Sequence, residues 1–155
     1  MVKRNEHSKL SQCPLACALD IIGDHWTLLI IRNLMLFGCH EYKDMLAMPE
    51  AISSNILSNR LKKLEGADVI ASVPHPDSKR RKLYYLTDKG KGLVYAILDL
   101  ARWANQHIGD RTCIPEAARP LFEASPDEAA RMVLQNLAVW EQENLPQAAK
   151  KIITQ

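Results

Sequence analysis

The stretch that decides the fold is ISSNILSNRLKKL, residues 52–64. At about 100° per residue on a helix, the apolar residues of this stretch gather on one side. They are Ile56, Leu57, Leu61 and Leu64. The opposite side carries only amide, hydroxyl and basic groups, and Ser53 has the residue type and position of an N-cap. The pattern predicts an amphipathic helix that presents a short polar face to a partner.

The side chains of this polar face suit the major groove of DNA. Asn can bond adenine through two hydrogen bonds, Ser can bond bases or phosphates, and Lys can reach guanine or phosphate. The start of the helix, near Ser53, also offers free backbone N–H groups to a phosphate. The candidate DNA contacts are Ser53, Ser54, Asn55, Ser58, Asn59, Arg60, Lys62 and Lys63. Taken alone, such a face is more often the solvated side of an ordinary helix.

A basic cluster follows this helix about fifteen residues later. Residues 69–73 and 82–86 are predicted to form the two strands of a hairpin, with a turn near residues 75–78. The candidates at the predicted tip are Ser78, Lys79, Arg80 and Arg81. Adjacent cations repel each other, and DNA phosphates or the minor groove would compensate for this repulsion. A basic loop alone could equally serve solubility, but a polar helix followed by a basic hairpin is a more specific combination.

The remaining elements complete a known layout. Helices are predicted over residues 14–22, 27–37 and 41–47, and a long helix capped by Thr87 over residues 88–107. Residues 27–37 are apolar nearly all round, so we expect them at the centre of the core. This order predicts a mostly α-helical winged helix-turn-helix with one small β hairpin and extra terminal helices for dimerisation. The expected divisions are an arm (1–12), the DNA-binding domain (13–109) and a helical extension (110–155), in which Ser125-Pro126 starts a helix.

The composition is that of a globular protein, and the charge is uneven. Hydrophobic residues make up 47% and charged residues 25% of the 155 residues, which excludes a disordered chain. The formal net charge of +2 is too small to indicate a nucleic-acid partner by itself. Residues 53–82, however, hold seven basic and three acidic side chains, whereas residues 110–155 hold five basic and seven acidic ones. We therefore expect a local basic face and no DNA contact from the extension.

Four stretches of the chain together resemble the HxlR-type winged-helix transcription regulators. They are LDIIGDHWTLLIIRNL (19–34), YKDML (42–46), the helix quoted above, and RRKLYYLTDKG (80–90). The resemblance covers about residues 13–107 and implies a homodimer that pairs through residues 13–22 and 93–107. A two-fold dimer predicts an inverted-repeat operator. The chain departs from the family at Asn55, where a basic residue is common, at Ala67-Asp68, which replaces a Gly-containing turn, and in its longer C-terminal segment.

The cysteines raise the question of sensing. Some HxlR-type regulators respond to oxidants or electrophiles through a cysteine at the start of the first helix, and Cys13 matches that position. A helix N-terminus favours the thiolate, which gives a physical reason for reactivity. The alternative is a structural thiol at the dimer interface, and Cys17, one turn further on, is a candidate partner. No zinc-type spacing joins the Cys and His residues of this region, so we predict no metal and no cofactor.

Other functions are disfavoured by what the sequence lacks. It has no Gly-rich phosphate loop, no nucleophile elbow and no HExxH motif, so we do not expect an enzyme. It has no signal peptide, and its longest apolar stretch, residues 26–38, is too short to span a bilayer. We therefore expect a cytoplasmic protein without a membrane partner. Two alternatives stay open: a winged helix used only for protein contacts, and a dimer whose tail helps to bind a small-molecule effector.

Overall fold

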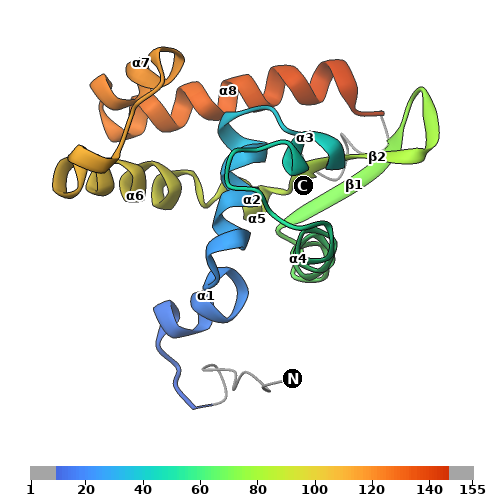
Figure 1. Cartoon of the computed structure of the whole chain (residues 1–155), viewed down its shortest axis with the longest axis horizontal. Coiled ribbons are helices and arrows are strands. Elements are labelled where there is room, and N and C mark those ends of the chain that lie inside the picture. Colours follow the sequence, from blue (N-terminus) through green and yellow to red (C-terminus); the bar gives the residue numbers. More distant parts are fainter. Residues whose placement is uncertain (1–9, 147–155) are drawn as a thin grey trace.

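The structure, a computed structural model, describes residues 10–146 (Figure 1). Its elements are α1 (Pro14–Ile22), α2 (His25–Leu36), α3 (Tyr42–Leu46), α4 (Ser54–Gly66), β1 (Ile70–His75), β2 (Ser78–Leu86), α5 (Asp88–Lys91), α6 (Val94–His107), α7 (Arg119–Glu123) and α8 (Pro126–Asn144). Two short 3-10 turns, Gly109–Arg111 and Glu116–Ala118, join α6 to α7. The predicted fold class, a mostly helical winged helix-turn-helix with one antiparallel hairpin, is confirmed. Residues 1–9 of the expected arm and 147–155 of the expected extension lie outside the described residues.

The core is built around α2. Ile30, Ile31 and Leu34 are at most 1% exposed, as expected for a helix that is apolar nearly all round. Helices α1, α4, α6 and α8 all contact α2. The side chain of Asp24 caps α2 by accepting a hydrogen bond from the Thr27 amide at 3.1 Å. The prediction that this segment forms the buried centre is therefore confirmed, and the cap places the helix start at His25.

The hairpin differs from the prediction at its tip. Strands β1 and β2 pair antiparallel from Ile70↔Leu86 outward, and the chain turns at residues 76–77. Proline fixes the backbone angle that a tight turn needs, so the chain reverses at once and β2 begins at Ser78 rather than at residue 82. Between the pairs His75↔Ser78 and Pro74↔Lys82, residues 79–81 have no partner on β1. The turn predicted near residues 75–78 is confirmed, but the basic run 79–81 belongs to β2, where it bulges beside the turn, rather than to the loop between the strands.

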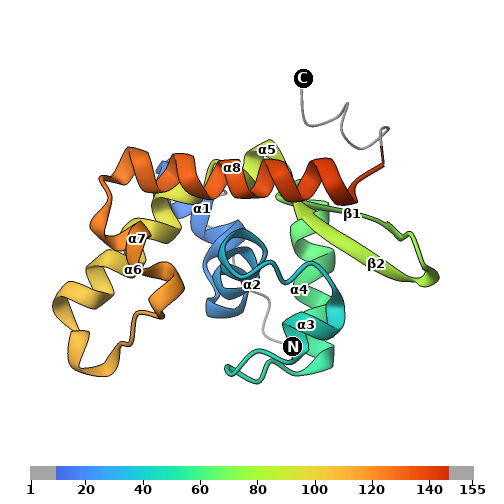
Figure 2. The same ribbon diagram turned by 90° about the horizontal axis from the view of Figure 1, so that it is seen from above.

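The predicted long helix over residues 88–107 is in fact two helices. Helix α5 ends at Lys91 and α6 begins at Val94. Gly90 is needed for the approach of α5 to the hairpin, because a Cβ there would lie 2.1 Å from the Val69 carbonyl oxygen. Gly92, a poor helix former, follows at the break. The break directs α6 away from the hairpin, toward α7 (Figure 2).

Helix α8 crosses the molecule from the α6–α7 end to the base of the hairpin (Figures 1 and 2). The predicted start at Ser125-Pro126 is confirmed, and the Ser125 hydroxyl caps the helix by accepting from the Glu128 amide. Ala130, Val133 and Leu137 of α8 lie in the same apolar cluster as the core of α2. The described part of the extension therefore shares the core of the winged helix.

Within residues 10–146, no single helix is long and apolar enough to cross a membrane. Helices α1 and α2 together reach the required length and composition, but they are bent by 79° at the break between them. In the same part of the chain, no three His, Cys, Asp or Glu side chains gather in a way that could hold a metal ion.

Candidate nucleic-acid interface

Helix α4 has the two faces that its sequence predicts. Leu57, Leu61 and Leu64 are at most 2% exposed and face the core. The exposed candidates are Ser53, Ser54, Asn55, Ser58, Asn59 and Lys62. The Ser53 side chain caps the helix by accepting from the Ile56 amide at 3.4 Å. The structure thus brings six of the eight predicted contact residues on this helix together on one accessible surface.

Arg60 and Lys63, the other two, turn toward Asp24. The Arg60 Nε donates to Asp24 Oδ1 at 2.9 Å, and the Lys63 Nζ lies 3.9 Å from Oδ2. Burial raises the pKa of Asp24, but hydrogen bonds from Thr27 and Arg60 outweigh this effect and the pKa lies below its ordinary value of 3.8. One carboxylate therefore caps α2 and also anchors α4 on it.

Arg60 also acts on the exposed face. Its Nη1 donates to Asn59 Oδ1 at 2.7 Å, which fixes the orientation of the Asn59 amide. The amide oxygen keeps a second lone pair and the NH2 group stays free to donate. Asn59 can therefore still form two hydrogen bonds with one base.

Tyr42, on α3, is a functional candidate that sequence reasoning missed. Its hydroxyl donates to the Ser54 carbonyl oxygen at 2.8 Å and lies 2.9 Å from Ser58 Oγ. Because the single hydroxyl hydrogen of Tyr42 is used at Ser54, Ser58 donates to Tyr42 and keeps its lone pairs for an outside donor. No sequence signal joins Tyr42 to residues twelve and sixteen positions away.

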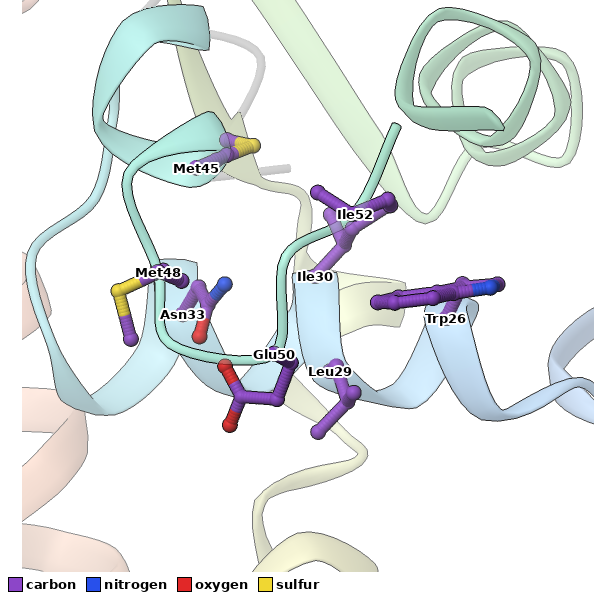
Figure 3. A pocket seen from close by; sticks show the side chains of 8 residues that line it. All are labelled: Trp26, Leu29, Ile30, Asn33, Met45, Met48, Glu50 and Ile52. Carbon is purple, nitrogen blue, oxygen red and sulfur yellow. The ribbon is translucent and has the colours of Figure 1, made fainter. Parts of the chain in front are cut away.

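The turn between α3 and α4 is held against α2. Glu50 accepts from the Arg32 guanidinium at 2.8 Å, and Ala51 takes a left-handed conformation with φ 54°. The cavity under this turn has a volume of about 10 Å³, room for at most one water (Figure 3). Its lining side chains come from α2, α3 and the turn, and are Trp26, Leu29, Ile30, Asn33, Met45, Met48, Glu50 and Ile52. This close packing fixes the angle at which α3 meets α4.

Cationic side chains line a hollow between α3 and β2. It has a volume of about 440 Å³ and is lined by Glu41, Tyr42, Lys43, Arg80, Arg81, Lys82 and Tyr84. Arg81 is tied to Glu41 by an ion pair of 2.9 Å, whereas Lys79 and Arg80 are exposed and have no ion-pair partner within residues 10–146. Burial alone would raise the pKa of Glu41, but Lys43 and Arg81 hold this pKa below its usual value. The Glu41 carboxylate therefore holds Arg81, whereas Lys79 and Arg80 stay free of ion pairs within residues 10–146.

The helices expected to pair two subunits carry exposed apolar side chains. Leu15 and Leu19 on α1 are 68% and 43% exposed, and Leu100 and Trp103 on α6 are 52% and 54% exposed. The apolar side chains of α6 therefore do not all lie in this chain's core, where Val94, Ile97 and Leu98 are buried. After the break at residues 92–93, α6 packs on α2 and α8 but leaves Leu100 and Trp103 exposed.

The candidate sensing residue lies on the surface. Cys13 is exposed at the N-cap position of α1, where its side chain makes no capping hydrogen bond. Cys17 is half-buried, Cys39 is buried and Cys113 is exposed, and all four thiols are free. Burial raises the pKa of the Cys39 thiol, which disfavours its reactive form.

A buried helical core around α2, a polar helix face and a basic hairpin define a winged helix-turn-helix protein of the kind found in transcription regulators. The chain belongs to the HxlR-like helix-turn-helix family, whose model matches residues 21–112.

The curated relatives are named as transcription regulators. YvaP of Bacillus subtilis is 35% identical over 91 residues, which are 59% of this chain and 83% of YvaP. YodB of the same organism is 31% identical over 109 residues, 68% of this chain and 96% of YodB. No catalytic activity is indicated by either name.

Two solved structures share the fold. PA1607, put forward as a transcription factor, has a TM-score of 0.59 and 32% identity, and the match covers 66% of this chain and 70% of PA1607. The reduced form of YodB from Bacillus subtilis has a TM-score of 0.51 and 31% identity, covering 63% of this chain and 95% of YodB. Neither the family match nor the match to YodB's structure spans the whole of this chain.

The anchoring role of Asp24 predicts an acid-sensitive fold. Because the pKa is lower in the folded than in the unfolded chain, the stability from Asp24 is present above the unfolded value and is lost as the pH falls through the folded one. We expect Asp24→Asn to be less stable than wild type at pH 7 in urea unfolding, and the difference to shrink below about pH 4. Asp77→Asn, which removes an exposed carboxylate from the hairpin turn, is the control. A difference for Asp24→Asn that stays constant with pH contradicts this role.

Proposed function

We propose that this protein is a sequence-specific DNA-binding transcription regulator that acts as a homodimer on an inverted-repeat operator. One observation carries the proposal: Tyr42 joins the two candidate DNA surfaces. Its hydroxyl is bonded to α4 at Ser54 and Ser58, and its side chain lines the same hollow as Arg80. The polar helix face and the basic hairpin therefore border one continuous surface.

In this proposal the two parts of the surface have different tasks. The exposed face of α4 enters the major groove, where Asn59 offers a donor and an acceptor to one base and Ser58 accepts from a base. Lys79 and Arg80 contact the flanking backbone or the minor groove, because they are free of intramolecular ion pairs within the described residues. Arg60 and Lys63 act mainly through Asp24, so the DNA contacts predicted for them have less support than those of the exposed residues.

The homodimer is supported by the exposed apolar side chains of α1 and α6. Burying such residues against a second copy is a strong drive to association. With two-fold symmetry, the two α4 helices would meet half-sites about one helical turn, roughly 34 Å, apart. A cytoplasmic location belongs to the same proposal, because its target is DNA.

The central experiment is selection of bound duplexes from a random pool at two salt concentrations. We expect an inverted repeat to be enriched, with affinity that falls steeply as salt rises. Failure to bind DNA at low salt would overturn the proposal. The alternative, a winged helix that contacts only proteins, would then take its place.

Two substitutions separate base reading from backbone contact. Asn59→Ala should lower affinity for the selected operator by about tenfold and relax the preference at one base pair, because it removes a base contact worth 1–3 kcal/mol. Arg80→Ala should weaken binding to all sequences alike and reduce the salt slope by about one. Fluorescence anisotropy with operator and scrambled duplexes measures both. If the two variants weaken every sequence equally, this division of tasks is wrong.

Introducing a single negative charge on α6 tests the proposed dimer surface. Trp103→Glu places a carboxylate among exposed apolar groups, so we expect a monomer in analytical ultracentrifugation and loss of the preference for inverted repeats. Val139→Glu, on α8 and 55% exposed, introduces the same charge outside this surface and should leave the dimer intact. A dimeric Trp103→Glu variant would place the subunit contact elsewhere.

Thiol sensing is a second proposal, favoured by the exposed Cys13 at a helix N-terminus and by the relative YodB, which has been solved in a form described as reduced. Hydrogen peroxide would oxidise the Cys13 thiolate to a sulfenic acid. We expect this to weaken operator binding in wild type and in Cys113→Ser, and to have no effect in Cys13→Ser. Equal sensitivity of the Cys13→Ser variant would exclude this role. A small-molecule effector, the other input expected from the sequence, has no separate support.

A further inference from the structure

The hairpin is covered on both faces. Side chains alternate along a strand, so Ile70, Tyr84 and Leu86 enter the main core on one face. On the other face, Ala71, Val73 and Tyr85 form a second apolar cluster. A hairpin at the surface commonly leaves such a face to water. Here Trp140 and Leu145, from the C-terminal end of α8, complete the second cluster, and residues 83–86 of β2 are all buried.

A chain of direct contacts leads from α8 to the wing strand. The rings of Trp140 and His40 stack with centroids 3.3 Å apart and an angle of 9° between their planes. His40 in turn holds β2 at Tyr84: the Tyr84 amide donates to the His40 carbonyl oxygen at 2.8 Å, and His40 Nδ1 lies 2.9 Å from the Tyr84 carbonyl oxygen. Burial lowers the pKa of His40, which favours the neutral ring with Nδ1–H as the donor. Trp140 therefore acts on the strand that carries Arg80 and Arg81.

The neighbouring residue fixes the helix at the base of the hairpin. Glu141 is only 6% exposed, and its carboxylate lies 2.8 Å from the Lys91 ammonium on α5. Helix α5 follows β2 after one residue, Thr87, so this pair holds α8 in register with the end of the strand. A buried ion pair of this kind tolerates little displacement, because separating the charges leaves the buried Glu141 carboxylate without its cation.

The other end of α8 is tied to α6. Tyr95 of α6 donates to Asp127 Oδ1 at 3.0 Å, and Arg102 of α6 donates to the carbonyl oxygens of Leu121 and Ala124 at 2.8 and 3.2 Å, just before α8 begins. Helix α8 thus spans from the proposed dimer helix to the wing, as Figures 1 and 2 show. All of α8 lies beyond residue 112, where the family match ends, so family membership does not imply this connection.

We infer that α8 is a brace for the wing, and that Trp140 is a positioning residue that holds β2, and with it Arg80, in place for DNA. This inference rests on the proposed function in its effect on DNA binding. The position of the wing itself does not depend on DNA, so the brace can be tested in the free protein as well.

The first test is amide hydrogen exchange of the free protein. In Trp140→Ala we expect exchange of the paired amides of residues 82–85 to become about tenfold faster, while the amides of α4 exchange as in wild type, because the strand opens locally without global unfolding. Trp140→Phe should restore protection, and Val139→Ala, the exposed neighbour, should change nothing. Acceleration spread evenly over α4 and the hairpin would overturn the inference, because it would show a general loss of stability.

The second test couples the brace to DNA binding. We expect Trp140→Ala to lower operator affinity about tenfold in wild type and much less in an Arg80→Ala background, because the wing contact is then already lost. Losses that simply add in the double variant overturn the role of Trp140 in DNA binding. If wild type binds no DNA, the proposed function fails, and the exchange experiment still decides whether α8 braces the wing.

Discussion

The burial of α2 is the constraint on which the rest of the structure depends. This helix is apolar nearly all round, so it must be covered on every side, and the preceding helix α1 together with α4, α6 and α8 from later in the chain supplies the cover. Asp24 adds direction to this packing, since its carboxylate caps α2 and binds Arg60 of α4. Because α4 is anchored by its apolar face and by Arg60, its remaining polar side chains face the solvent. The accessible polar face is thus a consequence of how the core closes.

A single carboxylate, that of Glu41, also positions the basic side chains of the hairpin. Glu41 holds Arg81, and residues 79–81 bulge from β2 without a partner on β1. The ion pair restrains Arg81 and the backbone beside it. Lys79 and Arg80 have no ion-pair partner within residues 10–146, so their charge is available to DNA phosphates. Tyr42 then joins this basic strand to α4. The candidate interface is therefore one surface assembled from three elements rather than two separate motifs.

Some interactions had no signal in the sequence. The turn was predicted near residues 75–78, where it lies, but the start of β2 was placed at residue 82 instead of Ser78 because the three consecutive cations were expected at the tip. The break at residues 92–93 was missed because a helical pattern continues across it, whereas the close approach of Gly90 to Val69 is visible only in three dimensions. The second buried face of β2 has no local signal either, because it is buried only where Trp140 and Leu145 lie on it.

The sequence by itself determined the elements and their chemistry: an apolar central helix, a capped amphipathic helix with a polar face, a basic hairpin and a helix that starts at Ser125. These follow from local patterns, since periodicity, capping residues and turn residues act over a few positions. The tertiary structure alone decided which polar groups stay free. Arg60 and Lys63 turn inward to Asp24, Tyr42 reaches Ser58, and Trp140 stacks on His40, because each pairing joins residues far apart in the chain that only the closing of the core brings within contact.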